Sequence, residues 1–205
     1  MRRFALILLI FSALGSVRAL SAPRLRFSYG LEWGTAVNLY FFENYTFMTD
    51  EQYMVNTRFS DGTFHLNGSI LATAGIDIAE KCNVSLCAGY QGLAPGFRSY
   101  PLSLNASWFI NGTTRSNGWF AGALAGMTFD EKFKKKNSHS AQIFAGYRMK
   151  VGKKLMLDLK SGIQASVIHP AEFIDHYTGS FVSSERVGSA DAYYGALFFM
   201  ISLNL

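Results

Sequence analysis

The residue types best suited to chemistry lie in one polar segment near the C-terminal end of the chain. This segment contains, in order, His169, Glu172, Asp175, His176 and Ser180. A histidine that is oriented by a carboxylate can act as general base for a serine nucleophile, which is the arrangement of a hydrolase. The candidate catalytic residues are therefore His169, His176 and Ser180. The spacing of the two histidines matches no familiar metal site, so we expect neither a metal nor a cofactor.

Six charged residues occupy the polar positions of segments in which polar and apolar residues alternate. They are Glu32, Asp77, Arg148, Lys150, Asp158 and Lys160. If these segments are strands, all six side chains point to the same side of the sheet. The turn Gly152–Lys154 then places Arg148 directly opposite Asp158. Because unpaired charge in a narrow interior is costly, we expect an ion-pair network, and a polar pore or proton path is the functional alternative.

A basic cluster lies between two of these segments, in the stretch EKFKKKNSH. Its lysines are Lys132, Lys134, Lys135 and Lys136. In an exposed loop, the four ammonium groups could bind lipopolysaccharide phosphates or another anionic partner. The alternative is the solvated tip of a hairpin, with no binding role.

Alternation of apolar and polar residues is the main structural signal of the chain, and it is typical of half-buried β-strands. It recurs in residues 26–40, 63–78, 84–90, 102–110, 118–129, 141–151, 155–168 and 192–205. The sequence therefore predicts an all-β fold of eight antiparallel strands. Ten strands are the alternative, because residues 52–59 also alternate. In the closing strand, Phe198 and Met200 fall on the polar face and predict an apolar plug inside.

Connections and aromatic residues indicate a barrel that crosses a membrane. Short turns at 79–81, 111–118 and 152–154 alternate with four longer segments, among them 42–62 and 169–190. Aromatic residues gather at both ends of the strands: Phe27, Tyr29, Trp108, Trp119 and Phe199 toward the short turns, and Phe41, Tyr90, Tyr100, Phe129 and Tyr193 toward the long loops. Such belts mark the two interfaces of a transmembrane β-barrel. We therefore expect an up-and-down barrel with four long extracellular loops.

The first 19 residues have the pattern of a cleaved signal peptide. Arg2 and Arg3 precede an apolar run that is too short to span a membrane, and Val17 and Ala19 fit a cleavage site. We expect residues 1–19 to be removed and residues 20–205 to form the barrel domain. The mature chain then has 16 basic and 14 acidic residues, a net charge of +2 that gives no support to nucleic-acid binding.

Two cysteines, Cys82 and Cys87, occur in the mature chain. In an extended strand they lie about 17 Å apart and point to opposite faces. A disulfide requires Cα atoms within about 7 Å, so we expect two free thiols.

Taken over its whole mature length, the chain resembles the small outer-membrane β-barrels of Gram-negative bacteria, the OmpA/OmpX-like class. The resemblance rests on the signal peptide, the eight alternating segments, the unequal connections and the aromatic final strand. It implies export to the outer membrane, contact with lipid and lipopolysaccharide, and insertion by the barrel-assembly machinery. The implied function is that of an integral, porin-like barrel with an occluded lumen, which has a structural role or binds a partner at the cell surface.

Two other functions remain open from the sequence. Small outer-membrane barrels also include lipid A-modifying enzymes, either acyl hydrolases or transferases, and the histidine-rich segment is compatible with that chemistry. A secreted, lipocalin-like soluble barrel is the third hypothesis. It should have an apolar interior and a polar exterior, whereas the interior predicted here carries Glu, Asp, Lys, Arg, Asn and Ser.

Overall fold

The computed structural model describes residues 26–94, 97–129, 138–175 and 177–205, which form an all-β fold. Its strands are β1 (Arg26–Met48), β2 (Met54–Ala79), β3 (Cys82–Ala94), β4 (Phe97–Phe109), β5 (Gly118–Phe129), β6 (Ser138–Lys150), β7 (Met156–Ile168), β8 (Phe173–Ile174), β9 (Phe181–Val182) and β10 (Val187–Asn204). No helix in the described part of the chain is long and apolar enough to span a membrane.

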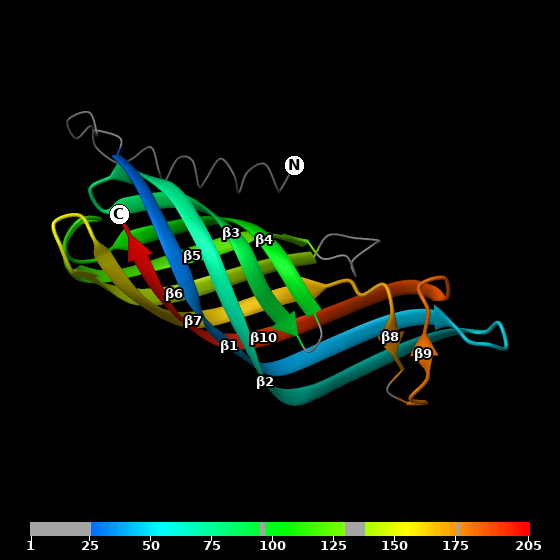
Figure 1. Cartoon of the computed structure of the whole chain (residues 1–205). Helices are drawn as coiled ribbons and strands as arrows, with labels where there is room; N and C mark the ends of the chain where they lie inside the picture. Colours follow the sequence, from blue (N-terminus) through cyan, green and yellow to red (C-terminus); the bar gives the residue numbers. More distant parts are fainter. Residues whose placement is uncertain (1–25, 95–96, 130–137, 176) are drawn as a thin grey trace, which may run out of the picture.

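Eight of these strands form a closed antiparallel barrel in the order β1-β10-β7-β6-β5-β4-β3-β2 (Figure 1). Neighbours in sequence are neighbours in space, and β1 closes the ring against β10. The two short strands β8 and β9 pair only with each other, outside the barrel wall. The prediction of eight strands is confirmed. The alternative of ten is wrong, because most of the alternating stretch 52–59 forms the beginning of the long strand β2.

The predicted alternation decides which side chains face outward. Over residues 102–108 of β4 the apolar side chains are exposed and the polar ones between them are buried. The exposed set is Leu102, Leu104, Ala106 and Trp108, and the buried set is Ser103, Asn105 and Ser107. The same arrangement holds in β6, where Ile143 is 65% exposed while the neighbouring Gln142 is buried. The barrel therefore has an apolar exterior and a largely polar interior, the reverse of a soluble barrel.

A β-bulge in β1 changes the alternation partway along the strand. Asn38 pairs with Ala196 and Tyr40 pairs with Gly195, so Leu39 is an extra residue in the ladder. Beyond such a bulge the side chains of the strand exchange faces. The outward position predicted for Phe41 is therefore wrong: its ring turns inward and stacks on Tyr194, with ring centroids 5.9 Å apart.

The two ends of the barrel differ in their connections. At one end, called here the turn end, residues 80–81, 110–117 and 151–155 join consecutive strands, and Leu205 hydrogen-bonds Tyr29. At the other, called the loop end, the connections are 49–53, 95–96, 130–137 and 169–186. Two of the four loops that were predicted to be long are therefore short. Most of the first is strand in β1 and β2, and the second is replaced by the longer strands β3 and β4.

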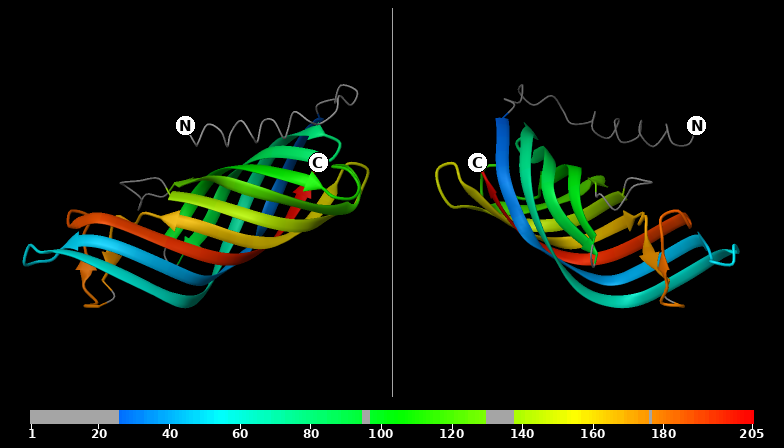
Figure 2. Two further views of the ribbon diagram at one scale, coloured as in Figure 1. Left: turned by 180° about the vertical axis from the view of Figure 1, so that it is seen from behind. Right: turned by 45° about the vertical axis from the view of Figure 1, so that its right-hand side comes forward.

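Three strands continue beyond the barrel at the loop end and form an extension (Figure 2). β2 pairs with β3 only as far as Ser69, and β10 pairs with β7 only as far as Ala192, while β1 continues between them. The β8–β9 hairpin crosses this extension (Figure 1). Its Phe173 ring packs on Tyr45, with centroids 4.0 Å apart, so the hairpin covers apolar side chains of β1.

Glycines in β5 and β6 make room for aromatic rings inside the barrel. Phe120 lies opposite Gly146 and Phe144 lies opposite Gly122, so each ring occupies the space above a glycine on the neighbouring strand. A Cβ atom at either glycine would lie 2.6 Å from a ring carbon. This reciprocal arrangement of Phe and Gly allows two large rings to fit side by side in a narrow interior.

We predict that Gly146→Val destabilises the barrel by about 1–3 kcal/mol, because the added side chain collides with the Phe120 ring in a close-packed interior. The free energy of unfolding, measured by urea titration of the refolded protein in vesicles, is the test. Gly68→Ala is the control, since a Cβ there meets nothing within 4 Å. Equal stability of the two variants would show that the Phe–Gly packing is not required.

Candidate functional site in the barrel interior

Three ion pairs lie inside the barrel at the turn end, and they combine three acidic with three basic side chains. The pairs are Glu32–Lys160, Asp158–Arg148 and Asp77–Arg115. The strands bring together five of the six charged residues that the sequence placed on this face. Since each of these three acids has a cation beside it, the charges of the three pairs cancel.

Arg148 and Asp158 face each other across β6 and β7. Two hydrogen bonds of 2.6 Å join the guanidinium Nε and Nη2 to the two carboxylate oxygens, a bidentate geometry that fixes both planar groups. The guanidinium also lies 4.7 Å from the centre of the Phe109 ring. Asn204 donates a further hydrogen bond of 2.9 Å to Asp158. This carboxylate is thus held by β6, β7 and β10 together.

Lys160 and Glu32 form the second pair, between β7 and β1. Both side chains are less than 10% exposed, so each charge depends on the other for compensation. Ser202 contributes a longer contact of 3.5 Å to the same carboxylate oxygen. The Lys160 ammonium also lies 5.3 Å from the centre of the Phe144 ring, which links this pair to the aromatic residues deeper in the barrel.

The third pair includes a residue that the sequence analysis did not identify. Arg115 lies in the turn between β4 and β5, and its Nε is 3.2 Å from Asp77. The same guanidinium donates to the Phe27 carbonyl at 2.8 Å, and Asn83 donates to Asp77 at 2.8 Å. The preceding residue of the turn, Thr114, is buried. Strand alternation does not predict where the side chains of a turn point, so it could not place Arg115 in the barrel mouth. The one indication in the sequence was that Asp77, on the inward face, had no cation predicted opposite it.

Lys150 lies outside this network, contrary to expectation. It is exposed at the end of β6, and its side chain makes no ion pair with another described residue. Lys150 lies two residues closer to the turn end than Arg148, and at that position its side chain no longer reaches the interior.

A small polar cavity remains among the three pairs. Its lining includes Glu32, Asp77, Arg115, Arg148 and Asp158, and its volume is about 30 Å³. That volume holds about two water molecules and no organic substrate. The cavity can therefore hold water that hydrates the charges of the three pairs, and no more.

Aromatic and aliphatic side chains pack together next to the ion pairs, toward the middle of the barrel. This cluster comprises Ala36, Cys87, Phe109, Phe120, Leu124, Phe144, Ala196, Phe198 and Met200. The two residues that predicted an apolar plug, Phe198 and Met200, are both buried in it. The two cysteines are free thiols, as the strand geometry predicted.

Amide side chains lie beyond this cluster, toward the loop end. Gln164 accepts hydrogen bonds from Gln91 at 2.8 Å and from Gln142 at 2.9 Å, so one amide connects three strands. Asn38 donates to the Leu93 carbonyl at 2.7 Å. These groups are all buried, and hydrogen bonding offsets much of the cost of removing them from water.

A second apolar cluster lies at the loop end, between the extension and the β8–β9 hairpin. Its buried members are Tyr45, Phe47, Leu93, Ile168, Phe173, Val182, Val187, Ala190, Ala192 and Tyr194. Tyr45 belongs to the extension, beyond the aromatic side chains at this end of the wall. Burial, with the neighbouring Glu43 as a second cause, raises the pKa of its phenol, which stays protonated at any physiological pH.

The candidate catalytic residues do not form a triad in the described part of the chain. His169 Nδ1 lies 2.7 Å from Asp191 of β10, and not beside Glu172 or Asp175. Ser180 shares a hydrogen bond of 2.7 Å with Thr178, within the hairpin. No hydrogen bond joins His169 to Ser180 among the described residues. A histidine–carboxylate pair is present, but the nucleophile that was predicted for it lies elsewhere.

Some of the predicted site residues lie outside the described residues. These are His176 and the four lysines of the basic cluster, Lys132, Lys134, Lys135 and Lys136. Within the described ranges, no group of three His, Cys, Asp or Glu side chains could hold a metal ion.

Comparisons with known proteins concern the fold. No protein-family model matches the chain, and no curated protein matches it. The outer membrane protein OprG from Pseudomonas aeruginosa is similar in structure over 87% of this chain and 95% of that chain, with 12% identity and a TM-score of 0.48. The outer membrane protease OmpT from Escherichia coli is similar over 93% and 100%, with 9% identity and a TM-score of 0.31.

We predict that Arg148→Met costs about 3–5 kcal/mol of unfolding free energy, because it leaves Asp158 buried without its counter-ion. The double change Arg148→Met with Asp158→Leu should cost less than the sum of the two single changes. A double-mutant cycle from urea titrations in vesicles measures this coupling. Lys150→Met, on the same strand but exposed, should stay within about 0.5 kcal/mol of the parent in vesicles of zwitterionic phosphatidylcholine. Additive single costs would contradict the proposed coupling.

Proposed function

We propose that this chain is an integral outer-membrane β-barrel with an occluded interior, which presents its loop end as a structural or binding surface outside the cell. The observation that carries the proposal is the reversed distribution of polarity. The outer wall is apolar, whereas the interior holds paired charges and amides. Lipid is the environment that stabilises such a wall, and closure of the barrel leaves no strand edge unpaired within it.

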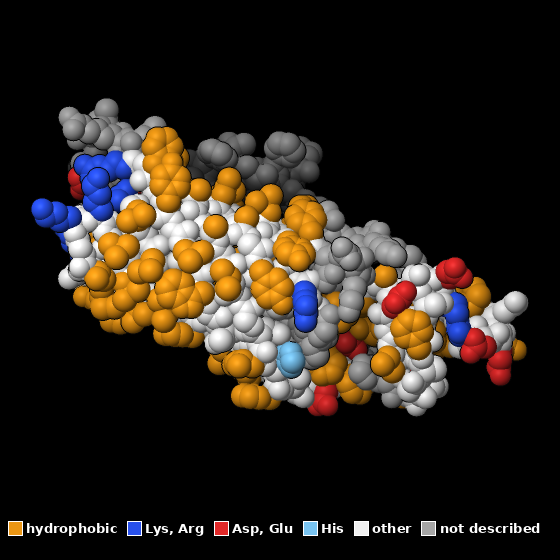
Figure 3. Space-filling model, in the orientation of Figure 1, with side chains coloured by type: hydrophobic (Ala, Val, Ile, Leu, Met, Phe, Trp, Pro, Cys, Tyr) orange, Lys and Arg blue, Asp and Glu red, His pale blue; other side chains and the backbone are white. Residues whose placement is uncertain are grey.

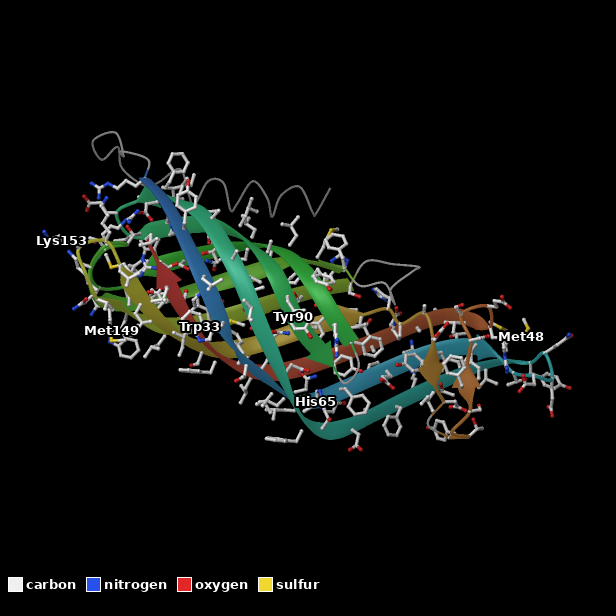
Figure 4. The ribbon with its side chains drawn as sticks, viewed as in Figure 1. Trp33, Met48, His65, Tyr90, Met149 and Lys153 are labelled. Atoms are coloured by element: carbon white, nitrogen blue, oxygen red, sulfur yellow. The ribbon has the colours of Figure 1, made fainter. Side chains whose placement is uncertain are left out.

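Exposed apolar side chains are spread over the face of the barrel wall that Figure 3 shows. Among the exposed residues are Leu31, Leu66, Ile70, Leu86, Leu104, Ile143, Ile163 and Leu197, from seven of the eight barrel strands. Figure 4 labels Trp33 and Tyr90 on this part of the molecule, between Lys153 and Met149 near one end and Met48 at the other. Apolar patches of this extent are not found on soluble monomers, which favours a membrane over the lipocalin-like alternative.

The aromatic side chains at the two ends of the wall are separated by the thickness of a membrane. On β5, Trp119 and Phe129 are both exposed, at 56% and 44%, and they lie ten residues apart. Ten residues of a strand tilted by about 40° rise about 25 Å, which equals the apolar height of outer-membrane barrels. T-shaped pairs occur in both belts, Trp119 with Tyr147 and Tyr90 with Tyr100.

The occluded interior is proposed from the packing of its contents. Charges, aromatic rings and amides succeed one another along the barrel axis, and the polar cavity between the ion pairs has a volume of only about 30 Å³. An eight-stranded barrel has just enough internal space for its own side chains. A water-filled channel would need small side chains where Phe109, Phe120 and Phe144 lie.

The role of the loop end is proposed from the extension. Its three strands and the hairpin project beyond the wall on one side, and they are held together by the apolar cluster around Tyr45 and Phe173 (Figure 2). An ordered surface outside the membrane is suited to contact with another macromolecule. Without a nucleophile beside His169, the described residues favour this role over lipid A modification.

We predict that Ile143→Arg destabilises the membrane-inserted barrel by about 2–4 kcal/mol, because it places a charge near the middle of the lipid-facing wall. Ser60→Arg, on an exposed position of the extension, should be nearly neutral. Urea titration in vesicles gives the two values, and cell fractionation with heat-dependent gel mobility tests whether the parent is a membrane barrel. A soluble parent, or equal tolerance of both arginines, would contradict the membrane assignment.

Planar-bilayer recording tests the occluded interior. We predict no discrete conductance steps for the refolded parent protein, because the aromatic cluster and the ion pairs leave no continuous water path. An open porin inserted under the same conditions is the positive control. Reproducible steps from the parent chain would overturn the proposal of a closed barrel without affecting the membrane assignment.

A further inference from the structure

Exposed basic side chains gather at the turn end of the barrel. They are Arg26, Lys81, Lys150, Lys153 and Lys154, here called the basic rim. They come from β1, β6 and two turns, 80–81 and 151–155. Among the described residues of this end, Glu80 is the one exposed acidic side chain, because Asp77 is buried against Arg115. Figure 3 shows a group of blue side chains at this end of the molecule.

The charges of the basic rim have no ionic partner among the residues that the structure describes. None of its five side chains forms an ion pair with another described residue, and Lys81 makes only a contact of 3.4 Å with the Ile110 carbonyl. Among the described residues of the loop end, exposed acids outnumber exposed bases, with Asp50, Glu51, Asp61, Glu172 and Glu185 against Arg58 and Arg98. The exposed positive charge of the described residues is therefore concentrated at one end.

Each part of the basic rim adjoins, along the chain, an exposed apolar residue at the edge of the wall. Arg26 precedes Phe27, which is 67% exposed, and Lys150 precedes Val151, which is 61% exposed. Lys81 precedes Cys82, the register partner of the exposed Trp108. Cations thus begin where the apolar wall ends. A ligand that fits this boundary must present hydrocarbon and negative charge at adjacent levels.

We propose that the basic rim binds the phosphate headgroups of anionic phospholipids in the leaflet that surrounds the turn end. The proposal rests on the membrane assignment made above. Lysine side chains of the turns 80–81 and 151–155 can reach headgroup phosphates while their methylene groups remain against lipid, and Arg26 and Lys150 add positive charge at the same end. A soluble anionic partner would account for the charge but not for the apolar side chains immediately beside it. The phospholipid class with a net negative headgroup meets both requirements.

Tryptophan fluorescence offers a direct test, because Trp108 and Trp119 are exposed at the turn end. The Trp33→Phe protein is refolded into vesicles containing equal amounts of phosphatidylcholine and phosphatidylglycerol. Either lipid carries bromine on its acyl chains, and the ratio of the two quenching efficiencies reports which lipid lies beside the tryptophans. We expect phosphatidylglycerol to be preferred by about threefold or more at low salt, and less so in about 0.5 M salt, which screens the attraction.

Two variants in this background distinguish the basic rim from other cations. Lys150→Gln, Lys153→Gln and Lys154→Gln together should reduce the preference toward unity, whereas Arg58→Gln with Arg98→Gln, which removes exposed cations of the loop end, should leave it unchanged. Heat-dependent gel mobility confirms that each variant is folded. Equal quenching by both lipids in the parent, or an unchanged preference in the triple variant, would overturn the proposal. Absence of quenching by either lipid would instead overturn the membrane assignment.

Discussion

Filling the interior of a narrow closed barrel is the constraint on which the rest of the structure depends. Eight strands enclose little more than the volume of their own inward side chains, so every inward residue must find a complementary neighbour. At the turn end the complement of each acid is a base, as in the fork of Arg148 on Asp158. Deeper in the barrel, the complement of Phe120 and of Phe144 is a glycine on the neighbouring strand. The two solutions meet where Arg148 and Lys160 lie over phenylalanine rings.

Interior packing also explains which features were predictable from the sequence. Alternation fixes the face of each side chain, so the wall, the interior charges and the opposition of Arg148 to Asp158 could be derived from residue order. The bulge at Leu39 could not be derived from residue order, because nothing in the residue types of Asn38, Leu39 and Tyr40 marks one of them as an inserted residue. Phe41, which follows the bulge, was consequently assigned to the opposite face.

Features outside the regular strands were harder to derive for a related reason. Arg115 enters the barrel from a turn, and neither its direction nor its distance from Asp77 follows from a period of two. The loop end presents the same difficulty: residues 42–48 and 54–62 have the composition of a polar loop with scattered aromatic residues. They are strands because the β8–β9 hairpin covers their apolar face with Phe173 and Val182, residues more than a hundred positions away. The long-range contact, not local propensity, defines the extension.

This division between wall and ends has a consequence for where function can reside. Lipid constrains the outer face to apolar side chains, and the limited internal volume constrains the size of the side chains on the inner face, so a substitution in the wall is tolerated only if it respects both. The extension is free of the first constraint, since its outward positions such as Asn56, Arg58 and Ser60 are polar and exposed. Its remaining requirement is the apolar cluster that holds the hairpin in place. Recognition of a partner can therefore vary on the outer side of β1, β2 and β10 while the barrel beneath them keeps the same packing.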